Sequence, residues 1–413
     1  MTDGSTALVT PFKGERYRDL ERSGDLIAPP YDVISTEQRR IYRERSEHNI
    51  VRLILPAGNG NRYGHAATIL ESWRSQGVLV QDREPAVYVV RQEFEAPDGE
   101  TKVRTGVIAA VVVEPYSQGR VRPHERTHRG PKEDRLALMQ STRAMFEALL
   151  LMCRDSSGVL QELLLSVVAG DSDFQTVLDG VRISLWSVPG QAGKAIASAA
   201  RDDGALYIAD GHHRYETAQI YHAENSAADR TLGLIVPLGD PGLTVLPTHR
   251  IIHGSSIDRS AVVSLLEERF EPTDLASAGD VEVYLGGVGE RLRCVVYLPG
   301  PTFLGLQVKE GVDLSWLPFA DEPTVLALDV AKIDSLVVDP LRSVGGSLRK
   351  ISYGPSSKSV IQRVYSEGAS AAVLMRPTGV EQVLAVADAG AFMPQKSTYF
   401  APKVPSGLVV LRW

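Results

Sequence analysis

The sequence predicts an α+β protein, and two local patterns carry this prediction. Two β-rich segments, residues 86–94 and 102–113, flank a Pro-Asp-Gly turn and are typical of a hairpin. A short apolar run at 206–209 is followed by Asp210-Gly211 and then by a helical pattern, which indicates a strand, a tight turn and a helix. Further strand-like and helix-like segments surround both patterns, so we expect helices and sheets in the same fold.

The composition is that of an ordinary globular protein. A length of 413 residues with 43% hydrophobic residues is enough for two or three domains. A net charge of -7 argues against broad electrostatic attraction to nucleic acid or to an anionic membrane. The two cysteines, Cys153 and Cys294, lie far apart in apolar surroundings, which excludes a disulfide framework and fits a reducing compartment. With no signal pattern and no apolar run near about 18 residues, we expect a cytoplasmic protein without a membrane partner.

The N-terminal region contains a rigid loop. Pro29 and Pro30 restrict the backbone that presents Tyr31 and Asp32, which suits a binding loop and a plain surface loop equally well. A helix is then expected to begin at Ser35, because this residue and Gln38 suit a capping box.

The later elements follow from the same kinds of pattern. Helices are expected at 65–76, from about 133, and at 159–168, 191–200, 261–270 and 358–368; strands are expected at 181–188, 232–238, 281–285 and 292–298. Residues 147–153 are strongly apolar and fit either a strand or the end of a helix.

Histidine is concentrated in the middle of the chain. Seven of the nine histidines lie between residues 124 and 253, and none follows residue 253. We therefore divide the chain into an N-terminal α/β region (1–85), a core (86–253) and a C-terminal α+β domain (254–413). Three short motifs gather most of these histidines, Pro123-His-Glu-Arg-Thr127, Asp210-Gly-His-His-Arg214 and Pro247-Thr-His-Arg250. Histidine in such numbers indicates proton transfer, phosphate binding or metal ligation.

The Asp210–Arg214 motif predicts a phosphate cradle. The first turn of a helix favours anions, yet here it carries His212, His213 and Arg214, which would repel the positive end of the helix dipole. A bound polyanion, such as a nucleotide phosphate chain, removes this conflict. The alternative is that Asp210 caps the helix and the histidines are solvated.

Two carboxylates are candidates for the chemistry. Glu125 has basic neighbours, which would keep it ionised and able to act as a general base; the alternative is a salt-bridged loop residue. Asp210 at a strand end suits Mg²⁺, which prefers carboxylates together with phosphate oxygens. The sequence contains no Walker loop, no Gly-x-Ser-x-Gly elbow and no convincing zinc spacing.

Five motifs together resemble a large bacterial family known only as a domain of unknown function. They are Pro29–Asp32, His124–Thr127 followed by Asp134-Arg135, Pro247–Arg250, Ala209–Ala218 and Met393–Lys403. The central part also resembles the ParB/sulfiredoxin-like fold, especially the free-serine kinases built on it. The resemblance implies a ParB/sulfiredoxin-like catalytic core with additional mixed α/β regions at both ends.

The same resemblance implies a Mg²⁺-dependent kinase of amino acid metabolism that uses ATP, with ADP as an alternative donor. Its expected acceptor is a small hydroxyl compound, free L-serine above all; no nucleic acid partner is expected, and a homodimer is left open. The implied catalytic residues are Glu125, Asp210 and His213, with Asp210 also as the metal ligand. The resemblance implies His212, His213 and Arg214 as phosphate-binding residues together with Asp210. The motifs themselves add His124, Arg126, Thr127, Arg135 and Gly211 as phosphate-binding candidates, and the candidate substrate-binding residues are Tyr31, Asp32, His249, Arg250, Lys396 and Lys403.

Two other functions remain open. A ParB-like module could bind a nucleotide for regulation, without catalysis. A metal-dependent hydrolase could use the same histidines and carboxylates, although their spacing is unlike that of known zinc motifs.

Overall fold

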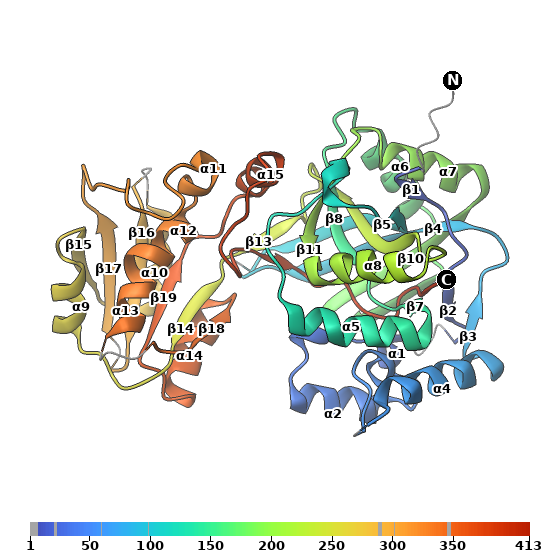
Figure 1. The fold of residues 1–413 in the computed structure, drawn as a ribbon, viewed down its shortest axis with the longest axis horizontal. Helices are drawn as coiled ribbons and strands as arrows, with labels where there is room; N and C mark the ends of the chain where they lie inside the picture. The colour runs from blue at the N-terminus through green and yellow to red at the C-terminus, as the bar shows by residue number, and fades with distance from the viewer. Residues whose placement is uncertain are drawn as a thin grey trace. The chain divides into compact units, whose positions relative to one another are not determined.

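The computed structural model describes residues 7–19, 23–58, 60–97, 99–287, 291–300, 302–344 and 348–413. The chain forms two compact units, Met1–Thr244 with Pro402–Trp413, and Val245–Ala401 (Figure 1). The segments 1–85 and 86–253 expected from the sequence thus share the first unit up to Thr244, and the end of the chain returns to it. Helices and several sheets occur together, as expected, whereas the ParB/sulfiredoxin-like core stays a prediction.

The first unit is built on a nine-stranded sheet. Its strand order is β6-β11-β8-β12-β5-β4-β10-β9, and β1 pairs with β5. The strands are β1 (Val9–Thr10), β4 (Ala86–Glu95), β5 (Thr101–Val112), β6 (Val121–Arg122), β8 (Leu149–Cys153), β9 (Phe174–Leu178), β10 (Val181–Pro189), β11 (Leu206–Asp210) and β12 (Arg230–Pro237). The hairpin of β4 and β5 confirms the first pattern read from the sequence.

Strand β8 resolves the apolar stretch at 147–153. All five residues of Leu149–Cys153 are buried, and β8 pairs with β11 on one side and with β12 on the other. A central strand covered on both faces has no polar alternation, which explains why its periodicity was uninformative.

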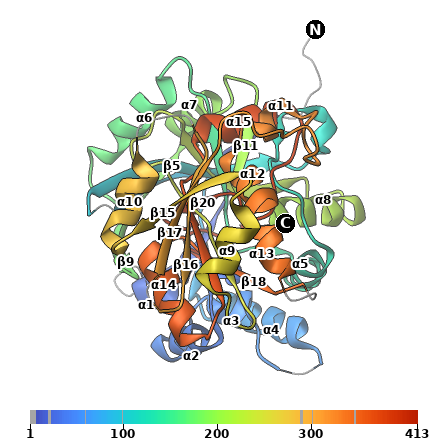
Figure 2. The ribbon, with the colours of Figure 1, turned by 90° about the vertical axis from the view of Figure 1, so that its left-hand side faces the viewer.

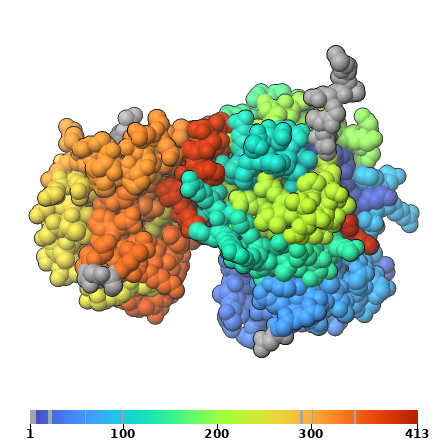
Figure 3. All heavy atoms as spheres, viewed as in Figure 1, coloured from blue at the N-terminus to red at the C-terminus, as the bar shows by residue number. Residues whose placement is uncertain are grey.

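Helices surround this sheet. They are α1 (Ser23–Leu26), α2 (Thr36–Arg45), α3 (Val51–Ile54), α4 (Arg62–Ser75), α5 (Arg129–Thr142), α6 (Val159–Val168), α7 (Gly190–Ala199) and α8 (His212–Glu224), with short 3-10 turns at Tyr31–Val33 and Tyr116–Gln118. The capping box of Ser35 and Gln38 is confirmed. Helix α5 begins at Arg129, earlier than expected from the pattern. It packs against α8 at the surface of the first unit, where Figure 3 shows the two helices side by side.

The end of the chain is tied into the first unit by backbone hydrogen bonds. Ser406 N donates to Ala28 O at 2.8 Å, and Gly407 N donates to Phe146 O at 2.9 Å. Strand β21 (Leu411–Arg412) then pairs with β7 (Ala144–Met145), while β2 (Glu15–Tyr17) pairs with β3 (Leu79–Gln81). The residues from Pro402 onward therefore belong to the first unit in space.

The second unit has a six-stranded antiparallel sheet of order β15-β17-β16-β19-β14-β18. The strands are β14 (His249–Ile252), β15 (Phe270–Leu275), β16 (Arg293–Leu298), β17 (Thr302–Val308), β18 (Ile351–Gly354) and β19 (Ala371–Met375). The other elements are α9 (Arg259–Leu266), α10 (Ala278–Gly286), α11 (Pro323–Leu326), α12 (Asp329–Ile333), a π-helical turn (Asp334–Val338), α13 (Asp339–Ser343), α14 (Ser357–Ser366), α15 (Val380–Asp388), and the paired β13 (Thr244–Leu246) and β20 (Tyr399–Ala401). Figure 2 turns this unit toward the viewer.

The strand expected at 281–285 is wrong, because this segment lies in helix α10. Val281 and Leu285 are buried in the core with residues of α14 and the sheet, while Val283 is 76% exposed. Burial at a spacing of four with exposure between is a helical pattern, and the short apolar run concealed it. Among the described residues, no helix is both long and apolar enough to cross a bilayer.

Candidate functional site

The turn between β11 and α8 requires glycine. Gly211 has a φ of 100° and is the N-cap residue of α8. A Cβ atom at this position would lie 2.8 Å from Leu149 Cδ2 and 2.9 Å from Arg214 Nη2. The left-handed backbone disfavours other residues, and an added Cβ atom would displace the side chains of Leu149 and Arg214. The strand–turn–helix predicted from the sequence is confirmed.

Asp210 anchors two cations at this turn. Its Oδ2 atom accepts from Arg214 Nη2 at 2.7 Å, and its Oδ1 atom pairs with Lys403 Nζ. Arg214 also donates to Ala148 O at 2.6 Å and is buried. The cap of α8 is Gly211 and not the Asp210 side chain, so the capping alternative is not observed. Both carboxylate oxygens of Asp210 contact cations, and the role of Asp210 as a Mg²⁺ ligand stays a prediction.

The guanidinium of Arg214 stays protonated and positively charged. Burial lowers the pKa of a guanidinium, but the carboxylates of Asp210, Glu147 and Asp32 raise the pKa of Arg214 above its ordinary value. The site therefore keeps a permanent positive charge at the start of α8.

The adjacent histidines hold the loop that carries Glu125. His212 Nε2 accepts a hydrogen bond from the backbone N–H of His124 at 3.2 Å, and His213 Nε2 accepts one from His128 N at 2.9 Å. The rings of His124 and His212 meet edge to face, with centroids 4.5 Å apart. Residues 124–128 are thus fastened to the first turn of α8.

His212 is not one of the cations that the sequence suggested. Burial lowers the pKa of His124 to about 4 and the pKa of His212 well below its ordinary value. His212 is therefore neutral near pH 7, and its Nε2 atom already accepts a backbone hydrogen bond. His212 therefore adds no positive charge to the first turn of α8, because burial keeps its imidazole neutral.

Glu125 lies at the same end of α8. One ligand atom each from His124, Glu125 and His212 lies within 4.8 Å of the others, which is a spacing that could hold a metal ion. The proximity of His212 places Glu125 at the helix end that also carries Arg214. The structure thus brings together the two motifs on which a shared site depends.

The loop of Tyr31 and Asp32 joins this site through Glu147. Tyr31 N donates to Glu147 Oε1 at 2.9 Å, and the guanidinium of Arg135 lies 4.1 Å from the centre of the Tyr31 ring. Arg135 Nη1 is 3.5 Å from Glu147 Oε2. Burial, together with Asp32, raises the pKa of Tyr31 to about 12, so its hydroxyl stays protonated. Sequence reasoning missed Glu147, although a carboxylate opening a buried apolar run needs a polar partner.

Glu216 is a second missed residue. It accepts a hydrogen bond from Thr127 Oγ1, and Lys132 Nζ lies 2.8 Å from its Oε2 atom. Arg126, in contrast, is exposed. Glu216 lies on α8, so these contacts tie the loop to the helix at one more point.

Three expected substrate residues lie in the second unit. His249 Nδ1 accepts a hydrogen bond from Met375 N at 3.2 Å, and the buried Arg250 pairs with Asp334 at 2.7 Å. Arg250 also donates to Lys396 O at 3.0 Å. These contacts stabilise the interior of that unit, and substrate roles for His249, Arg250 and Lys396 stay predictions.

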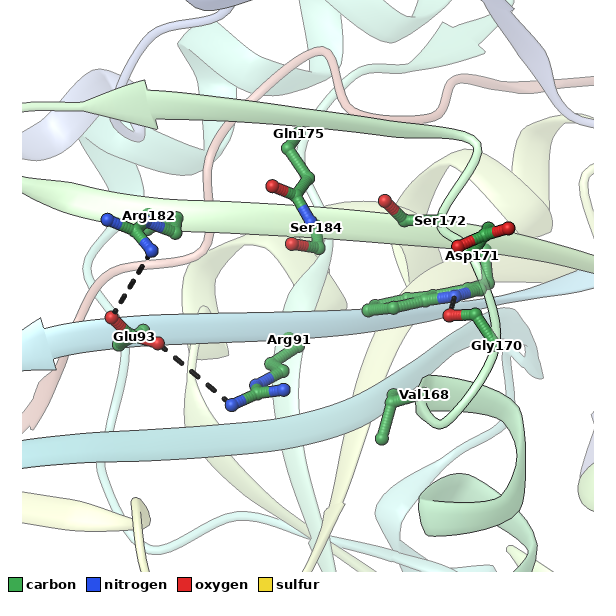
Figure 4. A pocket seen from close by; sticks show the side chains of 10 residues that line it. Arg91, Glu93, Val168, Gly170, Asp171, Ser172, Gln175, Arg182 and Ser184 are labelled. Carbon is green, nitrogen blue, oxygen red and sulfur yellow. Dashed lines mark hydrogen bonds and ion pairs between the residues drawn. The ribbon is translucent and has the colours of Figure 1, made fainter.

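A polar cavity of about 440 Å³ lies on β4, β9 and β10, near the opposite end of the sheet from β11 (Figure 4). Glu93 lies between two guanidinium groups there, 3.9 Å from Arg91 and 3.7 Å from Arg182. None of the site residues expected from the sequence lines it.

The chain has low similarity to several solved structures. A variant of a free serine kinase in complex with AMP is 14% identical, with a TM-score of 0.38, and the match covers 73% of this chain and 92% of that chain. Another free serine kinase variant, in complex with ADP, is 15% identical with a TM-score of 0.37, covering 74% and 93%. SbnI with a C-terminal truncation, from Staphylococcus aureus, is 10% identical with a TM-score of 0.35, covering 72% and 84%. No curated protein matches the chain.

A family profile matches most of the chain. The match runs over residues 9–331 and so includes four of the five motifs, all except the one at 393–403. The chain belongs to the family described as "Protein of unknown function (DUF1015)".

Proposed function

We propose that this protein is a kinase that transfers a phosphoryl group from a nucleotide to a small hydroxyl compound, with free L-serine as the expected acceptor. The observation that carries the proposal is the meeting of Glu125 with the start of α8, where Asp210 holds Arg214 and Lys403. The resemblance of two sequence motifs to those of free-serine kinases supports the same function.

The phosphates bind at the start of α8. Its first backbone N–H groups have no partner within the helix and attract anions. Arg214 and Lys403 add two positive charges at the same place. Phosphoryl transfer depends mainly on positioning and on neutralising charge, which these groups supply.

Glu125 acts as the general base. The acceptor hydroxyl gives its proton to Glu125, its oxygen forms a bond to the terminal phosphorus, and the bond from that phosphorus to the bridging oxygen breaks. The shortened nucleotide leaves with the electron pair. Mg²⁺ carried on the nucleotide would neutralise phosphate charge. His124 and His212 hold the base in place as neutral groups.

The test is a nucleotide-consumption assay with ATP or ADP and a panel of hydroxy amino acids. Glu125→Gln is expected to reduce the turnover rate about 100-fold or more and to leave the nucleotide dissociation constant within about threefold of the wild-type value. Glu133→Gln is the control, because Glu133 is an exposed glutamate on the same helix start, where it pairs with the exposed Arg129. Full turnover by Glu125→Gln would exclude this residue as the base. Tight nucleotide binding without consumption, under every acceptor, would instead favour a regulatory module.

The cluster of His124, Glu125 and His212 favours one second candidate, a metal-dependent hydrolase. Two neutral imidazoles and a carboxylate are ligand types that zinc prefers, and His212 would bind such an ion only by giving up the backbone N–H of His124. Stoichiometric metal in the purified protein, lost in His124→Gln, would support this function over the kinase.

A further inference from the structure

Two side chains buried in the sheet hold the backbone that carries Lys403. Gln92 on β4 and Arg104 on β5 lie directly opposite each other, and both are almost fully buried. Arg104 Nη2 donates to Gln92 Oε1 at 2.5 Å and to Pro402 O at 2.6 Å. Gln92 Nε2 donates to Lys403 O at 3.1 Å. Two successive carbonyl groups of the chain end are therefore fixed by one pair of side chains, which we call the Gln92–Arg104 clamp.

Burying the polar side chains of the clamp costs free energy. A guanidinium loses its hydration inside the sheet unless it finds acceptors, and burial lowers the pKa of Arg104 to about 10, with Asp240 and Asp210 acting in the opposite direction. Through Pro402, Arg104 also adjoins Lys403, the residue that contacts Asp210. A fold that needed only packing here would be served by an apolar pair across β4 and β5.

The chain end has several attachments besides the clamp. Ser406, Gly407 and Val410 each donate a backbone hydrogen bond to the first unit, and β21 pairs with β7. The clamp instead acts on Pro402 and on Lys403, the residue that contacts Asp210. Immediately beyond it, Lys403 Nζ meets Asp210 at the start of α8, with 15% of its side chain exposed.

We propose that Gln92 and Arg104 are positioning residues that aim Lys403 at the terminal phosphate of the bound nucleotide. The inference rests on the proposed function and adds that Lys403 is the group that distinguishes nucleotides by their number of phosphates. A lysine side chain has many rotamers, so fixing its backbone and pairing its ammonium with Asp210 limits where it points. The ammonium is then already in place when the phosphates arrive.

The test compares dissociation constants for AMP, ADP and ATP by calorimetry. The wild type is expected to prefer the nucleotides with more phosphates, and Lys403→Met is expected to reduce that preference about tenfold, the effect of one charge-assisted hydrogen bond. Arg104→Met is expected to reduce it by a similar factor. Because both act through the same ammonium, the double variant should lose little more than either single one. Gln92→Leu provides a milder variant if Arg104→Met fails to fold.

Arg349→Met is the matched control. Arg349 is also buried and also donates to backbone carbonyls, Val344 O at 3.2 Å and Ser255 O, but in the second unit. Arg349→Met should lower the stability of the protein without changing its preference among AMP, ADP and ATP. Three outcomes would overturn the positioning role alone. The nucleotide preference could be unchanged in Arg104→Met and Gln92→Leu, the affinity for all three nucleotides could fall by the same factor, or the effects could be additive with that of Lys403→Met. A wild type that binds no nucleotide would overturn the proposed function together with it.

Discussion

The backbone N–H of His124 donates a hydrogen bond to Nε2 of His212, 3.2 Å away and 88 positions later in the chain. An imidazole nitrogen accepts a hydrogen bond only when it carries no proton, so this contact requires neutral His212 with its proton on Nδ1. The bond fastens the residue next to Glu125 onto α8. The geometry of the candidate base therefore depends on the protonation state of a buried histidine.

Stability should depend on pH because of these histidines. Burial lowers the pKa of His124 to about 4, against about 6.5 in the unfolded chain. Between these values the unfolded state binds more protons, so the free energy of unfolding should fall as the pH falls from about 6.5 to about 4. His124 alone would contribute roughly 3 kcal/mol to that loss. Urea titrations from pH 7.5 to 4.5 measure it.

His124→Gln should flatten this dependence, because the titrating group is gone. His65→Gln is the control, since His65 is exposed on α4. If both variants kept the wild-type slope, His124 would not be the buried neutral group described here.

Replacing Gly211 should damage both stability and nucleotide binding. Gly211→Ala combines left-handed backbone strain with contacts under 3.0 Å to Leu149 and Arg214, and we expect a loss of about 3 kcal/mol. Gly119→Ala is the matched control, because Gly119 has a φ of 72° and nothing within 4 Å of the added Cβ. It should cost about 1 kcal/mol and leave nucleotide affinity unchanged. Equal losses in the two variants would contradict the close packing around Gly211.

Removing Arg214 should weaken nucleotide binding and stability together. Arg214→Met leaves Ala148 O without its donor and Asp210 without one of its cations, and we expect a loss of about 3 kcal/mol. Calorimetry should show nucleotide affinity reduced at least tenfold. Arg74→Met removes a comparable partly buried pair, with Glu15 at 2.7 Å, and should lower stability only. Unchanged affinity in Arg214→Met would exclude a phosphate-binding role.

Glu147 should control the order of the Tyr31 loop. Glu147→Gln weakens its pairing with Arg135 and its acceptance from Tyr31 N, at a cost of about 1 to 3 kcal/mol. Hydrogen exchange of the amides in residues 28–34 should become faster. The exposed Glu71, paired with Arg74, provides the control Glu71→Gln. Unaltered exchange in Glu147→Gln would show that this loop is held by other contacts.

Local patterns predicted much of the first unit. The hairpin of β4 and β5, the capping box at Ser35 and the turn at Gly211 depend on residues close in sequence, whose turn and periodic preferences act locally. Segments without such a local signal are harder to assign to a helix or a strand from the sequence. Periodicity alone fits the apolar run 147–153 to a strand or a helix end, and pairing with two neighbouring strands makes it a strand. The strand predicted at 281–285 is wrong, because the helical spacing of this short run becomes visible only in the burial of Val281 and Leu285.

The sequence alone determined which motifs exist and that a glycine turn opens α8. Only the tertiary structure decided how the motifs are used: His212 as a neutral acceptor, Glu147 as the partner of Tyr31, and the clamp on Lys403. Each of these contacts joins residues far apart in the chain. They form because the sheet register and the burial it creates bring those groups together, and neither register nor burial can be read from residues taken one segment at a time.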